Sequence, residues 1–135
     1  MSLNAYQIPE AVPGALDLYN WFGYWPSFHD AEILDITLSR KGLSAVRVHI
    51  FHRTNRVDEN RFYILEKHVV VTFLLKGITD CNLEGFSHQN VVSCIQLNIA
   101  ADGYVLRLGP CFGVAGSISA TDVRIQLVPG KPKAE

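Results

Sequence analysis

The sequence contains no apolar run that approaches the ~20 residues needed to cross a membrane. Its first residues, MSLNAYQIPEAVPG, lack the basic and apolar segments of a secretory signal, so we expect no export signal. Only three cysteines occur, an odd number without CxxC spacing, which favours a reducing compartment over a disulfide-stabilised secreted protein. We therefore expect a soluble cytoplasmic protein in which each cysteine is a small buried residue.

Signatures of common catalytic sites are also missing. The sequence has no GxSxG, P-loop or dinucleotide-binding motif, and no cysteine stands in a motif with a base. Arg47, His49, Phe51 and Arg53 place basic and aromatic groups along one segment, but the net charge of −1 argues against nucleic-acid binding. We expect a protein that is not an enzyme, that needs no cofactor or metal, and that binds neither nucleic acid nor membranes.

Apolar residues make up 48% of the 135 residues. A chain of this size buries roughly 68% of its unfolded surface, which is enough for one core. We therefore expect a single domain over residues 1–135, with its core at about 15–128 and a flexible tail at 129–135.

Alternation of apolar and polar residues predicts a mainly β protein. In the first strand, Leu34, Ile36 and Leu38 share one face, and Lys41–Gly42 forms the turn that follows. A short helix is expected at 14–22, ended by Gly23, while 52–60 and 109–116 are predicted to be loops. The strands are expected at 33–40, 46–51, 61–66 running on towards 69–77, 81–86, 91–99, 104–108 and 123–128. About seven strands favour an antiparallel β-sandwich or flattened barrel with a short N-terminal helix.

Charge is distributed unevenly along the chain. Residues 1–39 contain five acidic and no basic side chains, residues 40–76 carry a net charge of +5, and the remainder carries −1. Such asymmetry fits a face built for a charged partner, and it equally fits neighbouring strands of opposite charge that pair with each other.

Half of the fourteen aromatic residues lie in the first 28 positions, and several of them belong to the segment WFGYWPSFHDAE at 21–32. Aromatic side chains dominate binding hot spots, although they also fill the ends of small β cores. In an extended segment, Asp30 and Glu32 point away from His29, so a shared metal ion needs a bend. The partner-binding candidates are Trp25, Phe28, His29, Asp30, Glu32 and Asp35.

An alternative interpretation is a small metal- or ligand-binding β domain, with an enzyme as one form of it. It requires His29, Asp30, His68 and His88 to converge around one pocket, which segments distant in sequence can do in a β fold. A third interpretation is a homodimeric module, because pairing two copies covers exposed strand edges.

Taken together, several short motifs resemble the immunity protein 50 family of bacterial toxin systems, over roughly residues 18–128. The motifs are WPSFHDAEI at 25–33, YILEKH at 63–68, LEGFSHQN at 83–90 and CFGVAGSI at 111–118. The residues carried over from these motifs are Trp25, Phe28, His29, Asp30, Glu32, Lys67, His68, Gly85, Phe86, His88, Gln89 and Asn90. The resemblance leaves the roles of Lys67, His68, His88, Gln89 and Asn90 undefined.

The resemblance implies a cytoplasmic antidote that neutralises a cognate protein toxin by tight binding rather than by turnover. An acidic, aromatic segment is compatible with such an inhibitor, since a nuclease toxin would present a basic cleft to it. We therefore expect residues 10–35 to contribute to the partner surface.

Overall fold

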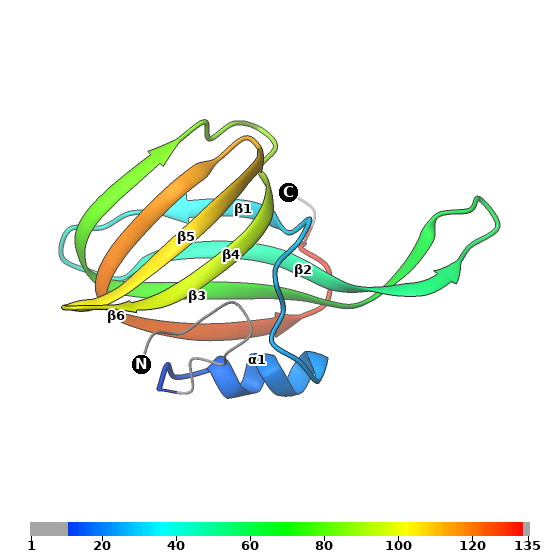
Figure 1. The fold of residues 1–135 in the computed structure, drawn as a ribbon, viewed down its shortest axis with the longest axis horizontal. Coiled ribbons are helices and arrows are strands. Elements are labelled where there is room, and N and C mark those ends of the chain that lie inside the picture. The colour runs from blue at the N-terminus through cyan, green and yellow to red at the C-terminus, as the bar shows by residue number, and fades with distance from the viewer. Residues whose placement is uncertain (1–10, 134–135) are drawn as a thin grey trace.

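The computed structural model describes residues 11–133 as one closed, flattened β-barrel with a short helix packed against it (Figure 1). Every strand pairing is antiparallel, and the strands follow each other around the barrel in the order β1-β2-β3-β6-β5-β4. The elements are α1 (Ala15–Phe22), β1 (Glu32–Thr37), β2 (Ser44–Val57), β3 (Tyr63–Glu84), β4 (Val91–Ala100), β5 (Gly103–Phe112) and β6 (Ala115–Pro129).

Strands β3 and β6 run through both halves of the barrel. The first half of β3 pairs with β2 and the last part of β6, whereas its second half pairs with the first part of β6. The chain turns between the halves at Gly77, which has φ 70° and is followed by a register shift between Ile78 and Asp80. A Cβ on Gly77 would lie 2.4 Å from Thr121 Oγ1, and this hydroxyl donates to the Lys76 carbonyl at 3.0 Å. Glycine therefore makes the corner possible.

Alternate side chains of every strand point into one continuous core, in which Phe73 and Leu106 are fully buried. The core begins earlier than predicted, because Val12 is also buried. Helix α1 contributes Leu18 and Phe22 to it. As an amphipathic helix of only 8 residues, α1 depends on this packing for stability. In the described part of the chain, no helix is long and apolar enough to cross a membrane.

The segment before α1 covers an open strand edge. Pairing between β5 and β6 stops at Ala120, so the later part of β6 has an unpaired edge on that side. The Ile125 N–H donates to the Pro13 carbonyl at 2.8 Å. Gly14 then turns the chain into the helix at φ 90°, and its missing side chain allows the backbone of β6 to approach.

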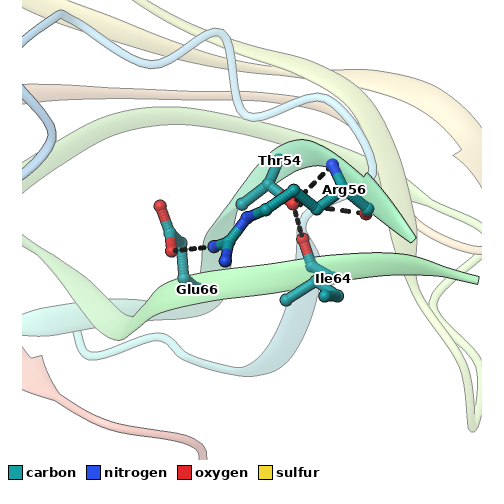
Figure 2. A network of polar contacts seen from close by, with 4 residues as sticks. All are labelled: Thr54, Arg56, Ile64 and Glu66. Atoms are coloured by element: carbon teal, nitrogen blue, oxygen red, sulfur yellow. Dashed lines mark hydrogen bonds and ion pairs between the residues drawn. The ribbon is translucent and has the colours of Figure 1, made fainter. Parts of the chain in front are cut away.

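A two-stranded arm, residues 52–66, projects beyond the barrel at the end of β2 and the start of β3 (Figure 1). The pairing slips between Arg53 and Val57, so that three residues of β2 face one residue of β3. Thr54 holds this bulge because its hydroxyl donates to the Ile64 carbonyl at 2.7 Å and accepts from the Arg56 N–H (Figure 2). Across the arm, Arg56 also pairs with Glu66 at 3.3 Å.

The predicted fold class, the helix and the first hairpin are confirmed. Two loop predictions are wrong for most of their residues. β2 continues through 52–57 into the arm, so only 58–60 of that loop lies outside a strand, and 109–116 is mostly paired strand around a tight turn. The strand predicted at 81–86 is the end of β3, which leaves six strands. The segments 52–57 and 109–116 are polar or glycine-rich, which suggested loops, but their backbone groups are paired across neighbouring strands.

Two further predictions were wrong for local reasons. A bulge between Ile33 and Asp35 turns Ile33 inward, and Leu38, which follows the last residue of β1, is 52% exposed. Cys81 and Cys111 are exposed rather than buried. Of the predicted tail, residues 134–135 lie outside the described residues, and the Gly130 N–H donates to the His68 carbonyl at 2.7 Å.

We predict that Gly14→Ala lowers the free energy of unfolding by at least about 2 kcal/mol. A Cβ at this position would lie 1.8 Å from the Ile125 carbonyl oxygen, so the segment would have to leave β6. The matched control is Gly23→Ala, where φ is 82° but nothing lies within 4 Å. The control should lose only the left-handed backbone cost of about 1–2 kcal/mol. Urea unfolding measures both, and equal losses would contradict the proposed clash.

Candidate functional site

The loop of residues 23–31, which carries Phe28, His29 and Asp30, lies at the base of the arm. This motif loop and the end of β2 line a depression of about 260 Å³. Polar side chains from both elements face it, and they include Tyr24, His29, Asp30, His52 and Arg53. The structure therefore joins part of the predicted partner segment to the arm.

Tyr24 and His52 form the polar link across this depression. The Tyr24 hydroxyl lies 2.7 Å from His52 Nδ1. Burial raises the pKa of Tyr24, so the phenol keeps its proton, and the tautomer of His52 decides which of the two groups donates in this hydrogen bond. Sequence reasoning missed both residues, since they are 28 positions apart.

Backbone strain in the motif loop separates its side chains. Phe28 and Asp30 have φ values of 66° and 63°, a conformation that costs roughly 1–3 kcal/mol at each non-glycine residue. The turn is held because the Ala31 N–H donates to the Phe28 carbonyl and the Asp30 N–H donates to the Val92 carbonyl, both at 3.0 Å. As a result, the adjacent side chains of Phe28 and His29 point in opposite directions.

Phe28 points inward and is only 3% exposed, with its ring 5.7 Å from that of Phe73. Its side chain is part of the core rather than of an exposed surface, and half-buried Trp25 packs against it. His29 points outward, with Nδ1 3.2 Å from the Ser93 carbonyl and Nε2 3.6 Å from the Asp30 carboxylate. Both His29 and Asp30 remain more than half exposed.

Glu32 and Asp35 lie on the outer face of β1, away from this depression. Asp35 pairs with Arg47 of β2, with 2.9 Å between Nε and Oδ2. Acidic β1 and basic β2 thus neutralise each other in part, as one interpretation of the charge asymmetry predicted. Glu10, which belongs to the same acidic segment, lies outside the described residues.

A larger groove of about 900 Å³ runs along the outer face of β1, β2 and β3. Glu32 and Thr72 lie on the sheet that it crosses, and its rims are the loop after β3 and the segment after β6. His88 and Lys131 line it from these two rims.

Asn90 connects the parts of the structure around this groove. It is 2% exposed; its Oδ1 accepts the N–H groups of Ser87 and Val114, and its Nδ2 donates to the Ser87 carbonyl. Its own carbonyl accepts the Ile33 N–H at 2.8 Å. Asn90 therefore has an architectural role, whereas neighbouring Gln89 is exposed and contributes its backbone carbonyl to Ser87.

Lys67 and His68 form an irregularity at the base of the arm. Lys67 has φ 54°, and its carbonyl accepts the Trp21 Nε1–H at 3.1 Å. His68 Nδ1 lies 3.0 Å from Nε2 of His49 on β2. Burial and the nearby positive charge of Lys131 lower the pKa of His68, and burial, His68 and Lys131 lower that of His49.

The structure places the four residues of the metal- or ligand-binding alternative in three different places. His29 and Asp30 line the depression, His68 lies beside His49, and His88 lines the larger groove. Within residues 11–133, no three His, Cys, Asp or Glu side chains gather as a metal-binding group.

Comparison with known proteins finds no family model, no curated protein and no solved structure that matches this chain.

We predict that Asn90→Ala lowers the free energy of unfolding by about 2–4 kcal/mol. The substitution leaves the buried Val114 N–H and the Ser87 N–H without their acceptor. Gln89→Ala is the matched control, because that side chain is exposed and should change stability by less than about 0.5 kcal/mol. Chemical denaturation of both variants measures the difference, and a loss below 1 kcal/mol in Asn90→Ala would argue against this connecting role.

We predict that His49 and His68 make the free energy of unfolding fall in acid. Because the folded pKa values of His49 and His68 lie below the ordinary value of about 6.5, the unfolded chain binds these protons more readily. The stability that the two neutral histidines contribute is therefore complete above about pH 6.5, and it is lost as the pH falls through their folded pKa values.

The measurement is the free energy of unfolding of the wild type and of His49→Gln/His68→Gln between about pH 5 and 8. The double variant should show a shallower decline towards acid, because two of the titrating groups are gone. Parallel curves for the two proteins would exclude the pair as the source.

Proposed function

We propose that this protein is a cytoplasmic immunity protein that binds and neutralises a protein toxin without turnover, and that the toxin docks on the arm and the adjacent motif loop. The observation that carries the proposal is the set of apolar side chains that the arm exposes. Clustered exposed apolar residues mark interaction sites on protein surfaces. The exposed fractions are 54% for Val57, 70% for Phe62, 53% for Tyr63 and 38% for Leu65.

The residue types on the arm are those that dominate binding hot spots. Besides Phe62 and Tyr63, the arm carries Arg53, whose guanidinium lies 4.9 Å from the centre of the Tyr63 ring. Aromatic residues and arginine are enriched among the side chains that contribute most to protein–protein affinity. Contact with the ring restrains the arginine beside Tyr63, so that less side-chain freedom is lost when a partner pairs with it.

The arm is also ordered before any partner arrives. At its tip, the Asp58 carboxylate accepts the N–H groups of Asn60 and Phe62 at 2.9 and 3.0 Å. The Asp58 N–H in turn donates to the Phe62 carbonyl at 2.9 Å. Together with the Thr54 bulge, these bonds fix the direction of a hairpin that two strands alone would hold only weakly. Preorganisation lowers the entropic cost of binding and favours a tight inhibitor.

The motif loop contributes exposed polar groups at the base of the same surface. His29 and Asp30 project outward beside the depression that Arg53 also lines. A partner that covers the arm and reaches its base therefore meets an apolar centre with charged groups around it. This arrangement is typical of protein–protein interfaces.

We predict that Phe62→Ser/Tyr63→Ser weakens toxin binding at least about thirty-fold, the effect of losing a hot spot of ~2 kcal/mol. The tagged protein is used to capture its partner from a lysate of the source organism. The captured protein is then expressed in a heterologous host with and without this chain. The wild type should restore growth, and the arm variant should fail to do so.

The matched control is Ile99→Ser, which removes a side chain that is 51% exposed at the far end of β4. It should bind and protect like the wild type. If the captured protein is not toxic, or if no partner is captured and solution mass shows a dimer through the arm, the immunity function is rejected. If the arm variant protects as well as the wild type, the docking surface is elsewhere.

A further inference from the structure

Along the arm, β3 has a neighbouring strand on one side only. Its pairing with β6 begins at the Val69–Pro129 pair, whereas its pairing with β2 reaches out to Tyr63. Among residues 11–133, no strand therefore lies on the outer side of Tyr63–Leu65, and the arm projects away from the barrel (Figure 1). We call this outer side of Tyr63–Leu65 the β3 edge. Such an edge can pair with a further strand.

The hydrogen bonds of the arm show which backbone groups point outward. The Phe62 carbonyl faces β2, because it accepts the Asp58 N–H at 2.9 Å. The Ile64 carbonyl also faces β2, where the hydroxyl that holds the bulge donates to it. Backbone groups point to alternate sides along a strand, so those of Tyr63 and Leu65 point away from β2.

Three of these outward groups are available to a partner. The Leu65 carbonyl is engaged by the ring of His68. The Leu65 N–H and both backbone groups of Tyr63 have no hydrogen-bond partner within the part of the chain that the structure describes. They lie at the spacing of an edge strand, which an added strand can match with its own backbone.

The side chains at this edge do not protect it from pairing. Natural edge strands are commonly blocked by proline, by charged residues or by bulges. Residues 62–65 of β3 read Phe-Tyr-Ile-Leu, without proline or charge, and Phe62, Tyr63 and Leu65 are exposed. The opposite edge of the arm differs, because β2 is polar there and its bulge at Thr54 interrupts the strand. The β3 edge is therefore the side of the arm that favours an added strand.

Charge indicates what kind of strand fits. Exposed Arg61 and Lys67 lie at the two ends of this edge, whereas Glu66 between them pairs with Arg56. A second copy of the chain is disfavoured, because the antiparallel register centred on Ile64 would place Arg61 opposite Lys67 of that copy. A strand with acidic residues near its ends would instead face two opposite charges.

We propose that the β3 edge binds an extended segment of a protein partner as an added β-strand. Apolar side chains of the segment pack at two alternate positions against Tyr63 and Leu65, and an acidic side chain lies towards each end, near Arg61 and Lys67. Main-chain hydrogen bonds fix the segment, and its side chains give specificity. The inference rests on the proposed docking of a partner on the arm, but its test does not require that partner to be a toxin.

Selection from a phage-displayed library of random 12-residue linear peptides tests the proposal. We expect the selected peptides to share alternating apolar residues with acidic residues on both sides. A synthetic peptide of the selected sequence should bind Leu65→Pro at least about tenfold more weakly than Leu65→Ala. Both variants lose the leucine side chain, but only proline lacks the outward N–H, and an edge strand tolerates proline where its N–H faces solvent.

Two measurements do not depend on the proline variant. Arg61→Glu/Lys67→Glu should weaken peptide binding at least about tenfold. Arg40→Glu/Lys41→Glu is the matched control, because it makes the same change of charge in the turn before β2, at the opposite end of that strand from the arm. It should bind the peptide like the wild type.

Amide hydrogen exchange locates the bound peptide. The amides of Tyr63 and Leu65 should exchange more slowly in the complex, whereas the Ile64 amide, which faces β2, should change little.

The proposal is overturned if no peptide is enriched on the wild type over Leu65→Pro, if the proline and alanine variants bind equally, or if the Tyr63 and Leu65 amides gain no protection. It is also overturned if the wild type is a dimer that Leu65→Pro converts to a monomer, because a second copy would then occupy the edge. Capture of a non-toxic partner would reject the immunity function without affecting these results, so the two failures are distinct.

Discussion

The corner that Gly77 and Thr121 form in β3 and β6 is the constraint on which this barrel depends. These two long strands belong to both halves of the sheet, so neither half can form its pairings unless both strands bend at the same level. A side chain at Gly77 would collide with Thr121, and the Thr121 hydroxyl satisfies the Lys76 carbonyl where the ladder is interrupted. Once the corner is made, the inward faces of both halves enclose one core.

Closure on the opposite side is much less extensive. β1 and β4 share only the pairing of Glu32 with Val91, and the remaining contacts come from the motif loop and from Asn90. This explains why the motif residues differ so much in burial. Phe28 and Asn90 complete the wall of the barrel, while His29 and His88 lie on its outside. A short motif can therefore combine residues that build the fold with residues that are free to contact a partner.

The sequence predicted the parts of the fold that follow from local periodicity. The helix at 14–22, its end at Gly23 and the first hairpin all depend on residues near each other in the chain. Residues 52–60 were predicted to be a loop because they are polar, whereas 61–66 was predicted to be a strand. The first strand of the arm is held by pairing and by the Thr54 bulge. Likewise, the contact of His49 with His68 joins two strands, and the periodicity of a single strand does not reveal which residues of neighbouring strands lie side by side.

The register shift beside Phe51 sets the direction of the arm, which begins just beyond the histidine pair. Two residues of β3, Lys67 and His68, are accommodated opposite one residue of β2, and the positive φ of Lys67 absorbs the difference. Without this extra residue, the side chains of the arm would change sides relative to the barrel, and the arm would continue along the line of the barrel. Trp21 fixes the irregularity from the helix by donating to the Lys67 carbonyl. The helix that covers the edge of β6 therefore also sets the base of the projecting arm, which links the packing of the core to the surface offered to a partner.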